Sequence, residues 1–128
     1  MRGMLIQFAK FAMVGALGTG VHYALMFTLI EAVDWPAEAA TTLGAACGAG
    51  VNYLLNYRFT FRSSARHPIA LTKFVAVAAI GLLINAAIVA ALTRLLALDP
   101  LPAQLAATAV VLAWGFLANR TWTFGAGR

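Results

Sequence analysis

Apolar residues follow one another along this chain in four long, nearly unbroken runs, separated by short polar or proline-bearing segments. A helix needs about 20 mostly apolar residues to cross a hydrocarbon layer roughly 30 Å thick. Strands that cross a membrane would instead alternate apolar and polar residues. We therefore expect an all-α membrane protein with four transmembrane helices, over Phe11–Ile30, Glu38–Tyr57, Phe74–Thr93 and Leu101–Asn119.

The composition supports a membrane location. Of the 128 residues, 62% are hydrophobic and 10% are charged, and the mean hydropathy is +0.85. A soluble domain of this size needs more polar surface to cover its core. The four runs occupy most of the chain, so we expect a single transmembrane domain over residues 1–128. The first run is too long for a secretory signal and no small-x-small cleavage pattern follows it, so we treat it as part of the fold.

The basic residues predict how the helices are oriented. Short loops that retain lysine and arginine stay in the cytoplasm. Of the nine basic residues only Arg94 would lie on the outer side. The others lie near the termini or in the central loop: Arg2, Lys10, Arg58, Arg62, Arg66, Lys73, Arg120 and Arg128. We therefore expect both termini and the central loop in the cytoplasm, with Glu31–Ala37 and Leu95–Pro100 outside. The net charge of +5 then serves topology and anionic lipid, and we expect no nucleic-acid partner.

The two halves of the chain repeat each other. A shift of 63 residues aligns residues 8–61 with residues 71–124. Small apolar residues match by chance in any two spans, but lysine, asparagine and Thr-Phe matches at one offset are harder to obtain. These matches are Lys10 with Lys73, Asn56 with Asn119, Thr60 with Thr123 and Phe61 with Phe124. Each repeat holds two spans, so we expect two helical hairpins inserted in the same direction, a parallel repeat.

Polar residues end stripes of small residues within the spans. At about 100° per residue, Gly15, Gly18 and His22 share one face of the first helix. Asn85 ends the equivalent stripe of the third helix, and Asn52 follows the Gly44–Gly48 GxxxG motif of the second. Such stripes pack helices closely, either within the chain or between copies, and the sequence does not choose. Polar groups at membrane depth also line functional cavities, and His22, Asn52 and Asn85 are our candidates for contacting a sugar.

A second set of candidates lies at the cytoplasmic ends of the spans. Arginine offers a planar fork that suits phosphate oxygens, and lysine offers a point charge. Topology and snorkelling to lipid headgroups would also place basic residues there. The clustering of amides beside them favours a lipid-phosphate site made of Lys10, Asn56, Arg58, Arg62, Lys73, Asn119 and Arg120.

No arrangement typical of an enzyme appears in the sequence. The acidic residues lie at the outer boundary, and there is no Cys/His metal spacing or glycine-rich phosphate loop. Cys47 is the single cysteine, so no disulfide forms within the chain, and we interpret it as a small buried residue. We expect no catalysis by this chain alone, no cofactor and no metal.

Three motifs resemble those of the GtrA-like family of small four-span membrane proteins. They are Phe8-x-x-Phe11-x-x-Val14-Gly15 with His22-Tyr23, then Val51-Asn52-Tyr53-x-x-Asn56-x-Arg58-Phe59-Thr60-Phe61, and Phe116-x-x-Asn119-Arg120-x-Trp122-x-Phe124. The resemblance covers nearly the whole chain. One departure is that Arg120 directly follows its asparagine, whereas Arg58 lies two residues after Asn56.

The resemblance implies a role in cell-surface polysaccharide synthesis. It implies translocation of a polyprenyl-phosphate-linked sugar across the cytoplasmic membrane, after a separate polyprenyl-phosphate glycosyltransferase has made that lipid. An alternative is a non-transporting adaptor that recruits or anchors such an enzyme. Four helices give little room to enclose a headgroup, so we expect a homo-oligomer, with a dimer as the simplest form. The alanine-rich composition favours a bacterial source. A small multidrug exporter fits poorly, because cation–proton exchange needs a membrane-embedded carboxylate.

Overall fold

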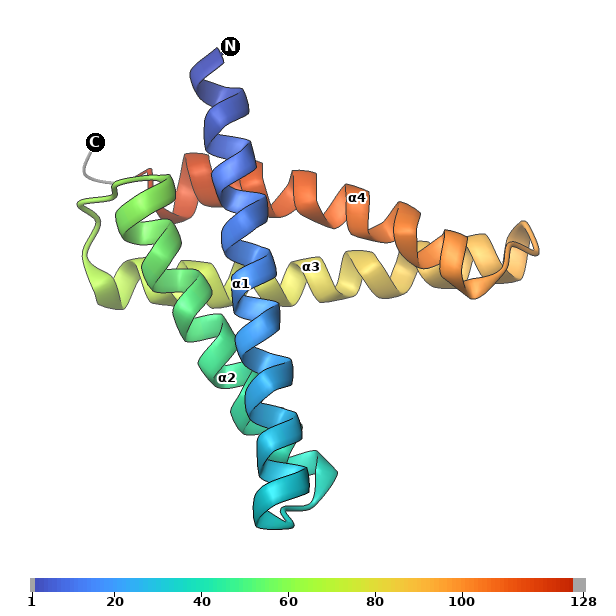
Figure 1. Ribbon diagram of the computed structural model, residues 1–128. Coiled ribbons are helices and arrows are strands. Elements are labelled where there is room, and N and C mark those ends of the chain that lie inside the picture. Colours follow the sequence, from blue (N-terminus) through green and yellow to red (C-terminus); the bar gives the residue numbers. More distant parts are fainter. Residues whose placement is uncertain (1, 126–128) are drawn as a thin grey trace. The chain divides into compact units, whose positions relative to one another are not determined.

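The computed structural model describes residues 2–125, and over that range the chain forms helices and no strands (Figure 1). The prediction of an all-α chain is therefore confirmed. The chain forms two compact units that divide between Arg62 and Ser63. Arg128, one of the basic residues assigned to the cytoplasmic side, lies outside the described residues.

The first unit is a helical hairpin followed by a wider helical turn. Helix α1 (Arg2–Val33) is followed by α2 (Ala37–Leu55) and by the π-helical turn η1 (Asn56–Thr60). The helices α1 and α2 pack side by side (Figure 1). Helix α1 begins before the predicted span, because the residues ahead of Phe11 contain no proline to interrupt it.

The second unit repeats this order of elements. Helix α3 (His67–Leu95) packs against α4 (Pro100–Ala118), which continues into the π-helical turn η2 (Asn119–Thr123). Prolines stand in the first turns of both helices, where a missing backbone N–H removes no helical hydrogen bond. Each unit is therefore a pair of helices that ends in a π-helical turn.

The tight connection between the helices has the same geometry in both units. The backbone takes a positive φ at Asp34 (58°) and at Ala97 (55°), positions 63 residues apart. The following N–H reaches back to close the helix, from Trp35 to the Leu29 carbonyl and from Leu98 to the Leu92 carbonyl, both at 3.0 Å. Each bond reaches six residues back, one more than the bond of a Schellman motif, and each follows a residue of positive φ just past the helix end.

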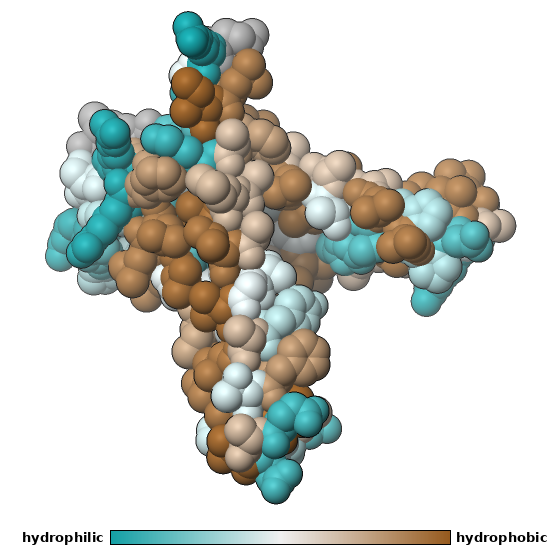
Figure 2. All heavy atoms as spheres, in the orientation of Figure 1, coloured by the Kyte–Doolittle hydropathy of each residue, from teal (hydrophilic) through white to brown (hydrophobic). Residues whose placement is uncertain are grey.

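Large apolar side chains cover the outside of the helices. Leu82 is 73% exposed, Leu83 70% and Leu105 63%. Cys47 is exposed too, so its interpretation as a buried residue was wrong. Figure 2 shows apolar residues along the α1–α2 hairpin and hydrophilic ones gathered at its ends. Soluble proteins rarely expose contiguous apolar surface on this scale. The chain is a multi-pass membrane protein.

Three helical segments are long and apolar enough to cross a membrane within the described residues: Arg2–Val33, His67–Leu95 and Pro100–Thr123. These contain three of the four predicted spans. The fourth, in α2, is rich in glycine and threonine and carries Glu38, so its hydropathy is lower. That α2 crosses the membrane stays a prediction.

Candidate functional site

Each unit ends in a π-helical turn that begins at an asparagine. The Phe61 N–H donates to the Asn56 carbonyl, and the Phe124 N–H donates to the Asn119 carbonyl, both at 2.9 Å. These bonds span five residues rather than four. Such turns are rare and are frequently found at functional sites. The sequence does not predict these turns, because one extra residue in a turn does not change the hydropathy pattern.

The two π-helical turns hold buried polar atoms. Asn56 and Thr123 are fully buried, and Thr60 and Asn119 are each 4% exposed. No hydrogen bond is formed by the Oδ1 atoms of the two asparagines or the Oγ1 atoms of the two threonines. Most buried polar atoms in proteins are paired, so four unpaired oxygens at matched positions are unusual.

Several other helical threonines donate their hydroxyl to a backbone carbonyl of the same helix. Thr72 and Thr121, for example, donate to the carbonyl four residues earlier, at 2.8 and 2.7 Å. Thr60 and Thr123 do not do so. Thr121 lies inside η2 and still bonds its carbonyl, whereas Thr60 and Thr123 are the last residues of their turns.

A lysine lies over an aromatic ring beside each π-helical turn. The Lys10 Nζ is 4.7 Å from the Phe59 ring centroid, and the Lys73 Nζ is 5.2 Å from that of Trp122. Both distances are within the range of cation–π attraction. Both lysines are half-buried. The rings orient the two predicted phosphate-binding lysines and leave ammonium protons for another acceptor.

The predicted arginines differ between the repeats. Arg58 and Arg62 are exposed, while Arg120 is half-buried and has interactions of its own. Arg58 is equivalent to Thr121, not to Arg120. The structure therefore places a lysine, a buried asparagine and an arginine at the same end of each hairpin, with the arginine at a different position.

Two of the three polar residues predicted to lie within the membrane, His22 and Asn85, are paired across their hairpins. The His22 Nε2 lies 3.1 Å from the Thr41 hydroxyl. In the second unit, the Gln104 amide donates to Asn85 at 2.8 Å, and Gln104 also bonds Thr108. Thr41 and Gln104 are equivalent in the repeat, and the sequence analysis did not single them out. The 63-residue offset applied to every polar position would have found them.

Glycines bring α1 and α2 into backbone contact. A Cβ at Gly48 would lie 2.5 Å from the Gly18 carbonyl oxygen, and one at Gly44 would lie 2.6 Å from that of His22. The GxxxG motif thus packs the hairpin within the chain, an alternative that the sequence left open. Asn52 lies beside this contact, where its Oδ1 accepts a hydrogen bond from Asn56.

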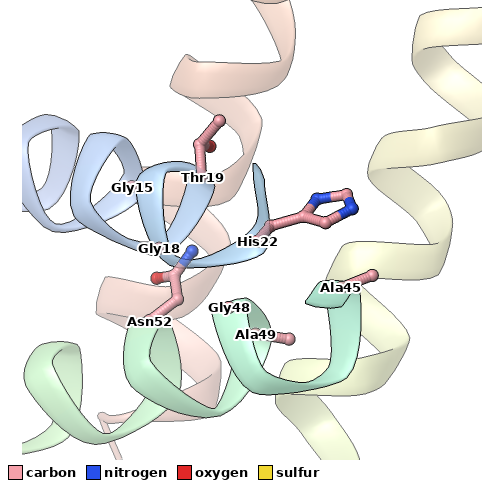
Figure 3. Close-up of a pocket in the computed structure, with 8 residues that line it drawn as sticks. All are labelled: Gly15, Gly18, Thr19, His22, Ala45, Gly48, Ala49 and Asn52. Carbon is pink, nitrogen blue, oxygen red and sulfur yellow. The ribbon is translucent and has the colours of Figure 1, made fainter. Parts of the chain in front are cut away.

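An open pocket of about 140 Å³ lies along this contact. Figure 3 shows Thr19 and His22 on α1 and Asn52 reaching from α2 toward α1. The pocket is therefore lined by His22 and Asn52, two of the three residues predicted to contact a sugar. Its lining consists of Gly15, Gly18, Thr19, His22, Ala45, Gly48, Ala49 and Asn52.

The fold and these features define a small multi-pass helical membrane protein with polar groups both at one end and partway along each hairpin. Its sequence matches the family "GtrA/DPMS, transmembrane domain" over residues 10–124. The chain belongs to that family, and the resemblance to GtrA-like proteins is confirmed. The family indicates a membrane protein of glycosyl-carrier-lipid sugar metabolism. No curated protein matches the chain at a significant level.

Proposed function

We propose that the protein translocates a polyprenyl-phosphate-linked sugar from the inner to the outer leaflet of the bacterial cytoplasmic membrane. All four helices cross the bilayer as two hairpins inserted in the same direction, with both termini in the cytoplasm. This topology follows from the distribution of lysine and arginine. The chain moves the lipid, and a separate glycosyltransferase makes it.

The main support for the proposal is that both hairpins carry the same kinds of basic and aromatic residues at one end. Lys10 beside η1 and Lys73 beside η2 are each held over a ring at equivalent positions. With Arg58 and Arg120, they give each hairpin a cationic end on the cytoplasmic side. Ammonium and guanidinium groups bind phosphate oxygens through charge-assisted hydrogen bonds. These ends collect the anionic head of the lipid from the inner leaflet.

The middle of the membrane is the main barrier to such a lipid. Unpaired polar groups cost several kcal/mol each in hydrocarbon. The polar side chains within the spans offer hydrogen bonds to sugar hydroxyls at that depth. The prenyl tail stays in contact with lipid along the exposed apolar faces. Because one chain encloses little volume, the working form is a homo-oligomer, with a dimer as the simplest case.

A flipping assay tests this function. The protein is reconstituted into vesicles that contain fluorescent prenyl phosphate lipids with different sugars, and bleaching by an external reagent reports the leaflet of each lipid. We expect faster flipping than in empty vesicles, and a several-fold loss for Arg58→Gln. Arg94→Gln is the matched control, because Arg94 lies at the opposite end of its span, and it should retain flipping. No acceleration for any of the sugars, or equal effects of the two substitutions, would refute the proposal.

The alternative is an adaptor that holds a glycosyltransferase at the membrane. The family description, which names a transmembrane domain, favours it. An adaptor would need its exposed apolar faces for the partner, and it would tolerate loss of the intramembrane polar groups. Replacing His22 and Asn52 with leucine separates the two functions. Normal surface glycan in cells that carry this variant would support the adaptor.

A further inference from the structure

We propose that the pocket between α1 and α2 binds the sugar ring of the lipid, and that the first hairpin alone provides this site. The inference rests on the proposed function and assigns part of it to one repeat. The pocket presents three neutral polar side chains, the Thr19 hydroxyl, the His22 imidazole and the Asn52 amide. They lie beside a backbone contact within predicted hydrocarbon depth.

The chemistry of the lining favours hydroxyl groups over phosphate. No lysine, arginine, aspartate or glutamate lines the pocket. An amide and a hydroxyl each donate and accept hydrogen bonds, as a sugar hydroxyl does. Asn52 uses its Oδ1 for Asn56, and its Nδ2 has no hydrogen-bond partner among the described residues. A neutral, hydroxylated ring supplies the acceptor that this Nδ2 lacks, while the phosphate stays with the cationic end of the hairpin.

The second hairpin lacks the polar side chains of Thr19 and Asn52, although Asn85 and Thr108 occupy the positions equivalent to His22 and Ala45. Leu82 stands for Thr19, Val111 for Gly48 and Gly115 for Asn52. A Cβ at Gly81 would lie 3.5 Å from the Val111 side chain and 3.6 Å from that of Trp114. The indole of Trp114 is fixed there by its hydrogen bond to the Val77 carbonyl, at 3.0 Å. Val111 and Trp114 therefore pack beside Gly81, the residue equivalent to Gly18, where the first hairpin has only backbone and Asn52.

Asn85, the third predicted sugar contact, is engaged in its own hairpin. It exchanges two hydrogen bonds with Gln104, one in each direction, at 2.8 and 3.3 Å. A ligand would have to break this amide pair to bind there. We therefore assign Asn85 to the packing of α3 against α4, and Asn52 to the ligand.

Gly15 allows the pocket to be filled without disturbing the helices. A Cβ at Gly15 would meet nothing within 4 Å, in contrast to Gly18 and Gly48. A leucine at position 15 would project into the pocket. Gly20 is the matched control, since a Cβ there also meets nothing within 4 Å and Gly20 does not line the pocket.

Asparagine NMR tests the inference. The chain has four asparagines, Asn52, Asn56, Asn85 and Asn119, so selective ¹⁵N labelling gives four side-chain amide signals. Full-length protein in nanodiscs is titrated with short prenyl phosphates carrying glucose, galactose, mannose or N-acetylglucosamine. At least one should shift Asn52 and leave Asn85 in place. The same prenyl phosphate without a sugar should not shift Asn52.

The variants and the flipping assay complete the test. Gly15→Leu should abolish the sugar-dependent shift of Asn52, and Gly20→Leu should retain it. The inference is overturned if none of the four sugars shifts Asn52, if Asn85 shifts equally, or if Gly15→Leu retains the shift. Sugar-dependent binding without flipping would refute translocation and keep the pocket. Flipping without a shift at Asn52 would support translocation and refute the sugar-binding pocket.

Discussion

His22 and Asn85 occupy the same position in the two repeats, and each meets a side chain 19 residues further along the chain. His22 lies 3.1 Å from Thr41, and Asn85 accepts a hydrogen bond from Gln104 at 2.8 Å. Both repeats thus have a polar contact between their helices at this position, although the two residues that form it differ between the repeats. In the second unit it is an amide pair, and in the first it borders an open pocket.

The amide pair should contribute measurably to the stability of the second hairpin. Hydrogen bonds between transmembrane helices average about 0.6 kcal/mol in double-mutant cycles and reach about 1.7. We expect a coupling within that range for Asn85→Leu and Gln104→Leu, measured by unfolding in mixed micelles. A cycle that pairs Asn85→Leu with Thr72→Val, on an exposed hydroxyl that bonds its own helix, should show no coupling. A coupling of zero for the first pair would contradict the geometry.

The first hairpin depends on a glycine contact that tolerates no side chain. Gly48→Val should destabilise the protein by about 1–3 kcal/mol, because its Cβ would overlap the Gly18 carbonyl. Gly50→Val is the matched control, since it lies on the same helix and its Cβ would meet nothing within 4 Å. Thermal unfolding followed by size-exclusion chromatography measures both. Equal melting temperatures for the two variants would show that α1 and α2 do not touch at Gly48.

Removal of an unpartnered buried hydroxyl should raise stability. Thr123 is fully buried and its Oγ1 makes no hydrogen bond. Thr123→Val keeps the shape and removes the desolvated oxygen, so we expect a gain of about 1 kcal/mol. Thr121→Val should bring no such gain, because that exposed hydroxyl is bonded to Leu117. Loss of stability in Thr123→Val, measured by the same unfolding assay, would mean that this oxygen has a partner in the membrane.

Much of the fold can be predicted from the sequence because the hydrocarbon of the membrane allows few backbone structures. Hydrocarbon requires long apolar helices with satisfied backbones, and this requirement is visible in the four runs of residues. The repeat was visible as well, through lysine, asparagine and threonine at one offset. The helices nevertheless extend beyond the hydrocarbon-length runs. Helices α1 and α3 begin at Arg2 and His67, several residues before the predicted spans, because a helix can continue past the hydrocarbon into water.

The candidate site was predicted only in part, and the reason is geometric. A helical wheel shows which residues share a face of one helix, and it does not show which residue faces them from another. It therefore found His22 and Asn85 and missed Thr41 and Gln104. The π-helical turns depend on hydrogen-bond register, which the order of residues does not reveal. The pocket depends on how closely two glycine surfaces approach.

The proposed function requires both hairpins to enter the membrane in the same direction. Single cysteines in a Cys47→Ser background test it, at Ser64 in the central loop and at Glu31 and Asp99 near the two hairpin connections. In intact cells, a thiol reagent that does not cross the membrane should label Glu31→Cys and Asp99→Cys. It should label Ser64→Cys only after the cells are opened. Labelling of Glu31→Cys and Asp99→Cys from opposite sides of the membrane would contradict the account.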